Sequence, residues 1–357
     1  MRRVALLGAT GSIGRQAIEV VAAHPELELC ALQSGSTSLE ALAAEHGVDH
    51  VRVGGNPVPL LEASRPDVVL NAVVGFAGVR ATLWSLEQGV TLALANKESL
   101  VAAGELAVRA RERGGGVLVP VDSEHSALHQ CLEGRDPRTV HALVLTASGG
   151  PFRSRPRAEL ESVTIDEALA HPTWAMGPKI TIDSATLANK GLELIEAHWL
   201  FDVAYDRIDV VVHPTSIVHA LVRLRDGALL AHLGMPDMRV PISYALTYPE
   251  RAATNVPPLE LEGLRLDFEA VDDEAFPMLA LARRAAARGG TMPCAYNAAN
   301  EVAVDAFLAG TIGFLEIATI VEATLERVSG APARDVDDLV AADAEARQLA
   351  ARGLQPA

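Results

Sequence analysis

Residues 4–14 of the chain are Val-Ala-Leu-Leu-Gly-Ala-Thr-Gly-Ser-Ile-Gly, a short apolar run followed by three evenly spaced glycines. The run is typical of a buried strand and the residues after it have helical spacing, so the glycines lie in a strand-to-helix turn. Glycines let the backbone approach a pyrophosphate, which the free amides at the start of a helix can bind. The spacing is GxxGxxG and not GxGxxG, but in this context it favours dinucleotide binding over an ordinary tight turn.

The same alternation of short apolar runs and helical segments continues over the first 120 residues, which predicts a doubly wound parallel sheet. Beyond about residue 122 few crossovers separate the predicted strands, so a mixed sheet is expected there. One of these strands is predicted at residues 179–182. Periodic, alanine-rich segments near the end predict a helical bundle. The predicted fold class is α/β: an N-terminal Rossmann-like parallel sheet, a central α+β catalytic domain with a mixed sheet, and a small C-terminal helical bundle.

This organisation predicts four parts of the chain. Residues 1–121 are expected to form the dinucleotide-binding domain and residues 122–256 a catalytic and connective domain. Residues 257–275, which begin Pro-Pro and contain an acidic stretch, are expected to be a linker, and residues 276–357 the helical domain.

Composition excludes several classes of protein. The chain has 357 residues, 49% of them hydrophobic, and a net charge of −16, which fits a globular protein and argues against a nonspecific nucleic-acid binder. No apolar stretch reaches the roughly 18 residues of a membrane span, and the first one ends too early for a signal peptide. Three cysteines without a CxxC pair favour a reducing cytoplasm.

Lysine is rare in this chain. Only three of the 30 basic residues are lysines, namely Lys97, Lys179 and Lys190, and each stands among Gly, Asn or Ser. A compact ammonium on a flexible stem does what a planar guanidinium cannot, so we expect at least two of them to be functional.

The end of the second predicted strand, residues 33–38, bears on the cofactor. NAD sites usually have an acidic residue here that binds the ribose 2′-hydroxyl, and this segment (Gln-Ser-Gly-Ser-Thr-Ser) has none. Hydroxyls and backbone amides can donate hydrogen bonds to a 2′-phosphate, which favours NADP(H). The segment contains no arginine to bind that phosphate.

Acidic residues follow the last strand of the first part. If the backbone is extended, Asp122 and Glu124 lie on one face, where a divalent ion such as Mg²⁺ or Mn²⁺ would keep both ionised. An N-cap Asp with Glu in the first helical turn explains the pair equally well. Asn96 and Glu98 also suit a helix start, but Lys97 between them does not, which indicates a nearby anion.

Three later segments carry further candidate residues. Residues 146–151 (Thr-Ala-Ser-Gly-Gly-Pro) either wrap an anion or form a glycine-rich turn. In residues 183–193, Asn189 and Glu193 share a helix face beside Lys190, and the interior Gly191 argues against a merely solvated face. Residues 171–178 (His-Pro-Thr-Trp-Ala-Met-Gly-Pro) are either a lid or a loop packed on the core.

Taken together and in this order, the motifs resemble those of the 1-deoxy-D-xylulose 5-phosphate reductoisomerase family over nearly the whole chain. They are GATGSIG (8–14), ANKESLV (95–101), VDSEHSA (121–127), LTASGGPF (145–152), HPTWAMG (171–177), DSATLANKGLE (183–193), VVVHPTSIVHALV (210–222) and MPCAYNAANEVAV (292–304).

The resemblance implies specific roles for matching residues. NADPH would contact Thr10, Gly11, Ser12, Ile13, Gly35, Asn96, Glu98, Met176 and Gly177. A Mg²⁺ or Mn²⁺ ion would be held by Asp122, Glu124 and Glu193, which are the catalytic residues together with Lys97. The substrate would contact Lys97, Ser123, Glu124, Ser148, His171, Trp174, Ser184, Asn189, Lys190 and Glu193, with residues 172–177 as a lid.

The implied reaction is the rearrangement and NADPH-dependent reduction of 1-deoxy-D-xylulose 5-phosphate to 2-C-methyl-D-erythritol 4-phosphate, in the non-mevalonate isoprenoid pathway. The family implies a homodimer. The cysteine usage, the net charge and the hydropathy lead us to expect a cytoplasmic protein without nucleic-acid or membrane partners. Ser36 and Thr37 depart from the family, which often has a basic residue and Asn there, and Met235 is a second departure. The alternatives are an NADP-dependent sugar-phosphate or semialdehyde dehydrogenase without rearrangement, which would not need the third carboxylate, Glu193, and an NADP-sensing regulatory protein.

Overall fold

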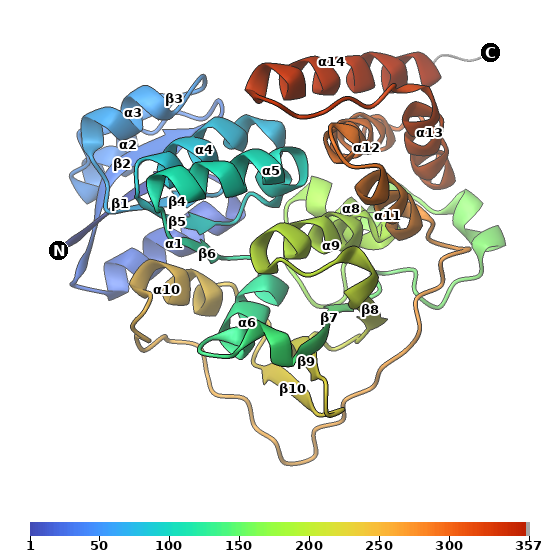
Figure 1. The fold of residues 1–357 in the computed structure, drawn as a ribbon, viewed down its shortest axis with the longest axis horizontal. Coiled ribbons are helices and arrows are strands. Elements are labelled where there is room, and N and C mark those ends of the chain that lie inside the picture. Colours follow the sequence, from blue (N-terminus) through green and yellow to red (C-terminus); the bar gives the residue numbers. More distant parts are fainter. Residues whose placement is uncertain (355–357) are drawn as a thin grey trace. The chain divides into compact units, whose positions relative to one another are not determined.

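The computed structural model describes residues 1–354, which form two compact units (Figure 1). The first unit comprises Met1–Leu100, Gly104–His129 and Asp237–Pro258; the second comprises Val101–Ala103, Gln130–Pro236 and the described residues from Leu259 onward. Across residues 1–354, every helix falls short of the length or the apolar character that a membrane span requires. The four-part division made from the sequence stays a prediction.

The first unit is built on a six-stranded parallel sheet with the order β3-β2-β1-β4-β5-β6. This is the order of dinucleotide-binding sheets, in which the direction of winding reverses between β1 and β4. The central strands are continuous apolar runs, as expected where helices cover both faces. The strands are β1 (Arg2–Leu7), β2 (Leu27–Ser34), β3 (His50–Val53), β4 (Val68–Asn71), β5 (Thr91–Leu94) and β6 (Leu118–Pro120).

Helices connect these strands, and one helix joins the unit from much later in the chain. The connecting helices are α1 (Ser12–Ala23), α2 (Glu40–His46), α3 (Val58–Ser64), α4 (Val79–Glu87) and α5 (Lys97–Gly114), and α6 (Ser123–Leu132) follows β6. The late helix, α10 (Arg239–Thr247), packs on α1, and its Ile242 and Leu246 are buried in one apolar cluster with Leu6 and Leu32.

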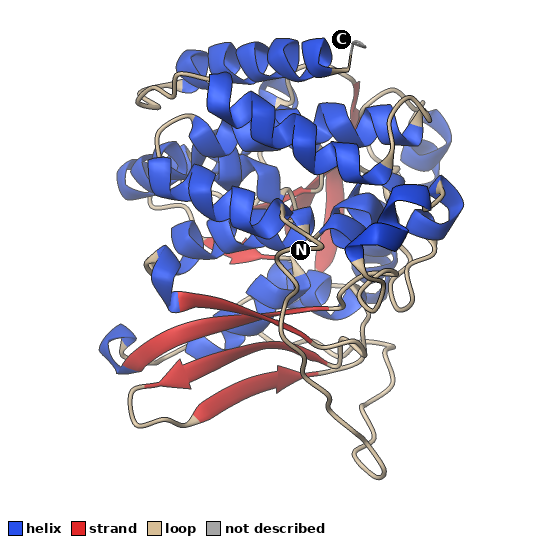
Figure 2. Cartoon of the chain, turned by 90° about the vertical axis from the view of Figure 1, so that its right-hand side faces the viewer, coloured by secondary structure: helices blue, strands red, loops and turns tan. Residues whose placement is uncertain are grey.

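The second unit contains a four-stranded mixed sheet with the order β10-β9-β7-β8 (Figure 2). β7 (Val140–Ala147) pairs in parallel with β8 (Ile208–Val212) and antiparallel with β9 (Val218–Leu224), which pairs antiparallel with β10 (Leu229–Leu233). Three helices lie between β7 and β8 in sequence: α7 (Ile165–Leu169), α8 (Pro178–Thr186) and α9 (Ala188–Phe201). Short 3-10 helices occur in the second unit at Pro137–Thr139, Arg157–Ser162 and Tyr205–Arg207, and in the first unit at Gly75–Gly78.

The second unit also holds the predicted C-terminal helices: α11 (Met278–Arg288), α12 (Met292–Leu308), α13 (Phe314–Arg327) and α14 (Val336–Gly353). α12 packs against the other three, and α11 packs against α9. The interior Gly191 of α9 permits this packing, because a Cβ there would lie 2.6 Å from the Ala282 Cβ and 2.9 Å from the Tyr296 hydroxyl.

The structure confirms the predicted fold class and corrects one element. Residues 179–182 were expected to form a strand, since Ile180, Thr181 and Ile182 are β-branched. They belong to helix α8, which begins with Gly177 as N-cap and Pro178 in its first turn, a favoured helix start. Burial of Ile182 against the neighbouring helices outweighs strand propensity. The short helices α3 and α7 were not predicted.

Candidate active site

The glycine-rich turn follows β1 at the carboxyl edge of the parallel sheet. Gly8 has φ +83°, and a Cβ there would lie 2.4 Å from the Ala72 carbonyl oxygen, beside the end of β4. A Cβ on Gly14 would lie 2.3 Å from the Gly8 carbonyl oxygen. Only glycine fits both positions. Helix α1 begins at Ser12, so the amides of its first turn have no intrahelical carbonyl and can bind a phosphate. The predicted cofactor residues Thr10, Gly11, Ser12 and Ile13 all lie in this turn.

The other predicted cofactor residues of the first unit lie at the same sheet edge. Gly35 directly follows β2 and is exposed. Asn96 directly follows β5 and is buried, but its side chain does not cap α5: Nδ2 donates to the carbonyls of Val73 (2.7 Å) and Gly75 (2.9 Å) and to Glu98 Oε2 (3.0 Å). Asn96 therefore holds the loop after β4, and the capping interpretation is wrong for its side chain.

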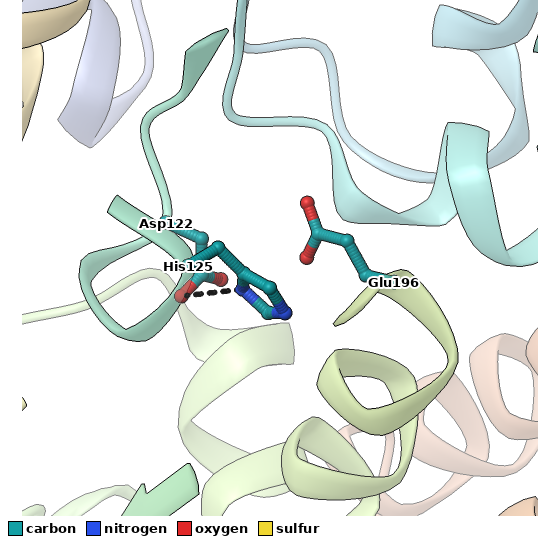
Figure 3. A group of neighbouring side chains, drawn as sticks. All are labelled: Asp122, His125 and Glu196. Carbon is teal, nitrogen blue, oxygen red and sulfur yellow. Dashed lines mark ion pairs between the residues drawn. The ribbon is translucent and has the colours of Figure 1, made fainter. Parts of the chain in front are cut away.

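Lys97 forms a buried ion pair with Asp122, and His125 Nδ1 lies 3.5 Å from the other Asp122 oxygen (Figure 3). Burial raises the pKa of Asp122, but the Lys97 ammonium and the His125 ring more than offset this, so its pKa lies well below the usual range. Asp122 is therefore ionised at neutral pH. Its carboxylate is the nearby anion that the position of Lys97 predicted. His125 belongs to the motif of residues 121–127 but was not predicted as a site residue.

Glu124 lies in the first turn of α6, and the Ser123 hydroxyl donates to its Oε2. The extended backbone assumed for Asp122 and Glu124 is therefore wrong: Asp122 precedes the helix, and its carbonyl accepts the Ser126 amide at 2.8 Å. This is the helix-start alternative. It does not exclude a metal, since both carboxylates belong to one short segment that begins a helix.

The second unit assembles a cluster of small polar groups at the end of β7. Ser148 Oγ hydrogen-bonds His171 Nε2 at 2.8 Å and lies 3.5 Å from Ser184 Oγ. Gly150 (φ +65°) brings this loop against α8, since a Cβ there would lie 2.9 Å from the Ala185 Cα. Three predicted substrate residues thus meet in a loop that glycines allow to fold tightly.

His171 also organises the predicted lid. Its Nδ1 accepts the amides of Thr173 (3.1 Å) and Trp174 (2.9 Å), so Nε2 carries the proton and donates to Ser148. Burial lowers the pKa of His171, consistent with a neutral ring. Trp174 lies with its ring centroid 6.3 Å from that of His219, on β9. Both lie in the second unit.

The far end of the lid enters α8. Met176 precedes Gly177, which is the N-cap of α8. Lys179 Nζ lies 2.8 Å from Asp183 Oδ2, and the buried Asn300 of α12 donates to Asp183 Oδ1 at 2.7 Å. Neither Asp183 nor Asn300 was predicted as a site residue, and the hydrogen bond between them joins residues 117 apart in the chain.

Helix α9 places Asn189, Lys190 and Glu193 together, as the spacing predicted. Glu193 is buried; Lys190 Nζ pairs with its Oε2, and Asn189 Nδ2 donates to its Oε1 at 2.5 Å. Glu196, one turn further along α9, is also buried and is drawn in Figure 3. His213, which belongs to the motif of residues 210–222, has a structural role: its Nδ1 bonds the Asp267 carbonyl at 2.7 Å, and its ring stacks on Phe268.

A parallel sheet with a glycine-rich turn beside its switch point defines an α/β protein of the dinucleotide-binding class. Three family models match this chain. The model of 1-deoxy-D-xylulose 5-phosphate reductoisomerase matches residues 4–58 and 41–104, and the model of the 1-deoxy-D-xylulose 5-phosphate reductoisomerase C-terminal domain matches residues 118–201. A third model, of the DXP reductoisomerase C-terminal domain, matches residues 233–349. The chain belongs to the 1-deoxy-D-xylulose 5-phosphate reductoisomerase family.

Individual relatives agree over almost the full length. The 1-deoxy-D-xylulose 5-phosphate reductoisomerase of Thermomicrobium roseum is 50% identical, with 97% of this chain and 96% of that protein covered. A crystal structure of DOX-P reductoisomerase in complex with NADPH, fosmidomycin and magnesium has a TM-score of 0.92 at 38% identity, covering 99% and 98% of the two chains. The Zymomonas mobilis enzyme in complex with NADPH has a TM-score of 0.90 at 39% identity, covering 100% of both chains.

Proposed function

We propose that this protein converts 1-deoxy-D-xylulose 5-phosphate to 2-C-methyl-D-erythritol 4-phosphate, with NADPH as reductant and a divalent metal ion. One equivalent of NADPH and one proton are consumed for each product formed. The observation that carries the proposal is the pair of buried, lysine-bound carboxylates Asp122 and Glu193, one in each unit. A dehydrogenase that only transfers hydride has no use for both, whereas an enzyme that must also break and form a carbon–carbon bond uses them to hold a metal.

Asp122, Glu124 and Glu193 would hold the Mg²⁺ or Mn²⁺ ion. Carboxylate oxygens are the donors that these hard cations prefer, and Asp122 is held ionised, so the residues present fit the group. When bound, the metal supplies Lewis acidity at the substrate's keto and hydroxyl oxygens. Asn189 orients Glu193 through the 2.5 Å hydrogen bond, as outer partners of metal ligands commonly do.

Ser148, Ser184, Asn189 and Lys190 would bind the substrate phosphate. The serines lie together, and the other two residues lie in the first turn of α9, where helix amides and a lysine favour an anion. Fixing the phosphate, which is remote from the reacting carbons, holds those carbons in one place. Lys97 would donate to a substrate oxygen, and the lid from Pro172 to Gly177 would exclude water with Trp174 over the substrate.

Thr10, Gly11, Ser12 and Ile13 would bind the pyrophosphate of NADPH, with Gly35, Asn96, Glu98, Met176 and Gly177 as further contacts. When bound, NADPH supplies the hydride that reduces the rearranged aldehyde. The main test is loss of NADPH absorbance on addition of the sugar phosphate, with and without EDTA. Oxidation of NADPH that EDTA abolishes and Mg²⁺ restores supports the proposal; turnover unaffected by chelation refutes the metal's role.

We infer that the protein is a homodimer. β10 is an edge strand with one partner, and its Leu229 and Leu233 are exposed, so the mixed sheet has an apolar edge that a second copy could cover. Sedimentation equilibrium tests this, since a single monomeric species would refute it. The cytoplasmic location stays a prediction that rests on cysteine usage.

A further inference from the structure

The adenosine end of the proposed cofactor site lacks a cation in the expected segment. Ser36 and Thr37 follow β2, are exposed, and contribute only hydroxyls and backbone groups. The 2′-phosphate of NADPH is a dianion that proteins usually bind with arginine or lysine near this position. A basic side chain on an element that flanks the end of β2 could bind this phosphate instead.

The neighbouring strand β3 carries one, Arg52. In the parallel register of β2 and β3, Gln33 pairs with Arg52, so the two side chains lie on the same face of the sheet. Gln33 Oε1 in turn accepts the amide of Gly8 at 3.3 Å. Arg52 is therefore next to the residue that contacts the glycine-rich turn.

The guanidinium of Arg52 lies at the carboxyl edge of the sheet, where ligands of such sheets bind. Its Nε donates to the carbonyl of Gly54 at 3.2 Å, and a Cβ on Gly55 would lie 3.0 Å from its Nη2. Both glycines have positive φ, +67° and +68°, so the chain turns back beneath the guanidinium.

This turn also touches the end of β2. The Gly54 amide donates to the Ser34 carbonyl at 2.8 Å, and a Cβ on Gly54 would lie 3.3 Å from the Gly35 carbonyl oxygen. The Arg52 guanidinium is thus bonded to a turn that contacts the predicted cofactor residue Gly35.

Arg52 keeps donors available for an anion. Within residues 1–354 it forms no ion pair, and its hydrogen bond to Gly54 uses only Nε. The side chain is half-buried, so it is partly ordered yet open to a ligand. A guanidinium in this state matches a phosphate with two parallel N–H donors.

We propose that Arg52 is the cofactor-specificity residue of this protein and binds the 2′-phosphate of NADPH, in place of the basic residue missing after β2. The inference rests on the proposed function, since it concerns the same dinucleotide site. The chemistry it names is a phosphomonoester on the adenosine ribose, which NADH lacks.

The test measures binding to the full-length protein without turnover. Dissociation constants of NADPH, NADH, 2′,5′-ADP and 5′-ADP are determined by calorimetry for wild type, Arg52→Met and Arg52→Lys. We expect Arg52→Met to weaken NADPH and 2′,5′-ADP about tenfold, equivalent to about 1.4 kcal/mol, and to leave NADH and 5′-ADP unchanged. Arg52→Lys keeps the charge but not the paired donors, so its loss is smaller.

Two further variants sharpen the result. Arg65→Met removes the same charge before β4, at the opposite sheet edge, and should leave every constant unchanged. Ser36→Arg added to Arg52→Met places a cation directly after β2 and should restore the preference for NADPH. This rescue also answers the objection that Arg52→Met only deforms the Gly54–Gly55 turn.

The outcomes separate the two proposals. Equal losses for NADPH and NADH in Arg52→Met would show that Arg52 only shapes the turn, and an unchanged NADPH constant would show that it does not contact the cofactor; either result overturns the inference. A wild-type protein that binds neither dinucleotide would instead overturn the proposed function.

Discussion

Replacing Lys97 by Met tests the ion pair at the centre of the proposed site. The side chains of Lys97 and Asp122 are only 6% and 9% exposed, so the substitution leaves a carboxylate in a buried site without its ammonium. Removing one partner of a buried pair typically costs about 3–5 kcal/mol. His125 Nδ1 lies 3.5 Å from the other Asp122 oxygen and partly compensates, which places the expected loss near the lower end, at about 3 kcal/mol.

The assay is thermal unfolding followed by circular dichroism, first in EDTA and then in Mg²⁺. At roughly 2 °C per kcal/mol for a chain of this size, Lys97→Met should lower the Tm by about 6 °C in EDTA. Mg²⁺ should recover part of that loss, because a divalent cation bound by Asp122 replaces the missing ammonium charge. The recovery should be larger than any effect of Mg²⁺ on the wild type.

Arg113→Met is the matched control. The Arg113–Glu87 pair belongs to the same unit, but its side chains are 63% and 43% exposed, so its loss should cost less than about 1 kcal/mol and show no response to Mg²⁺. If Lys97→Met is as stable as Arg113→Met, the Lys97–Asp122 pair is not buried as described. If it is destabilised but Mg²⁺ restores nothing, Asp122 does not bind the metal.

Three further predictions concern the second unit. Glu193→Gln should lower kcat by more than about 100-fold, because loss of an outer partner of a metal ligand alone typically costs about 10–100-fold and this change removes a proposed ligand itself. NADPH affinity should stay intact. NADPH oxidation and Mn²⁺ binding measured by electron paramagnetic resonance check this, and lost NADPH affinity would mean that the residue is misplaced. Asn300→Ala removes the hydrogen bond to Asp183, which holds α8 next to Ser184, and should raise KM for the sugar phosphate about tenfold. Asn297, one turn before Asn300 on α12, bonds Glu301 instead, so Asn297→Ala should leave KM unchanged. Equal KM values for the two variants would refute this. Burial lowers the pKa of His171, so its ring stays neutral below the ordinary value of about 6.5. The KM for the sugar phosphate should therefore stay constant as pH falls through that value and rise only as pH falls through the lowered pKa. If the His171→Asn variant shows the same rise, the rise belongs to another group.

Local patterns were sufficient for most of the fold. The strands of the parallel sheet are buried apolar runs separated by helices, so their order along the chain and the helix periods predict the architecture. The predicted helix 278–288 coincides with α11 as observed. The error at residues 179–182 arose where a β-branched run lies within a helix whose burial depends on α9 and α12, elements that come later in the chain.

The site was less accessible to sequence reasoning because its contacts are distant in the chain. Asn300 and Asp183 are 117 residues apart and meet only when α12 packs on α8. Arg52 was not predicted as a site residue because the phosphate partner usually follows the second strand, whereas Arg52 lies on the neighbouring strand β3 and is brought beside the end of β2 only by strand pairing. Asp122 and Glu124 illustrate a different difficulty. Two acidic residues so close in sequence suit both a metal site and the start of a helix, and the sequence alone does not distinguish the two. In the structure they lie at the start of α6.

The scarcity of lysine proves to be the most informative feature of the sequence. All three lysines pair with a carboxylate of their own unit: Lys97 with Asp122, Lys179 with Asp183 and Lys190 with Glu193. In each case the ammonium meets one carboxylate oxygen and another side chain approaches the second, namely His125, Asn300 and Asn189. A guanidinium takes both oxygens of a carboxylate with its parallel donors and would displace that second group. A chain that otherwise uses arginine therefore retains lysine where a buried carboxylate must be neutralised through one oxygen and oriented through the other.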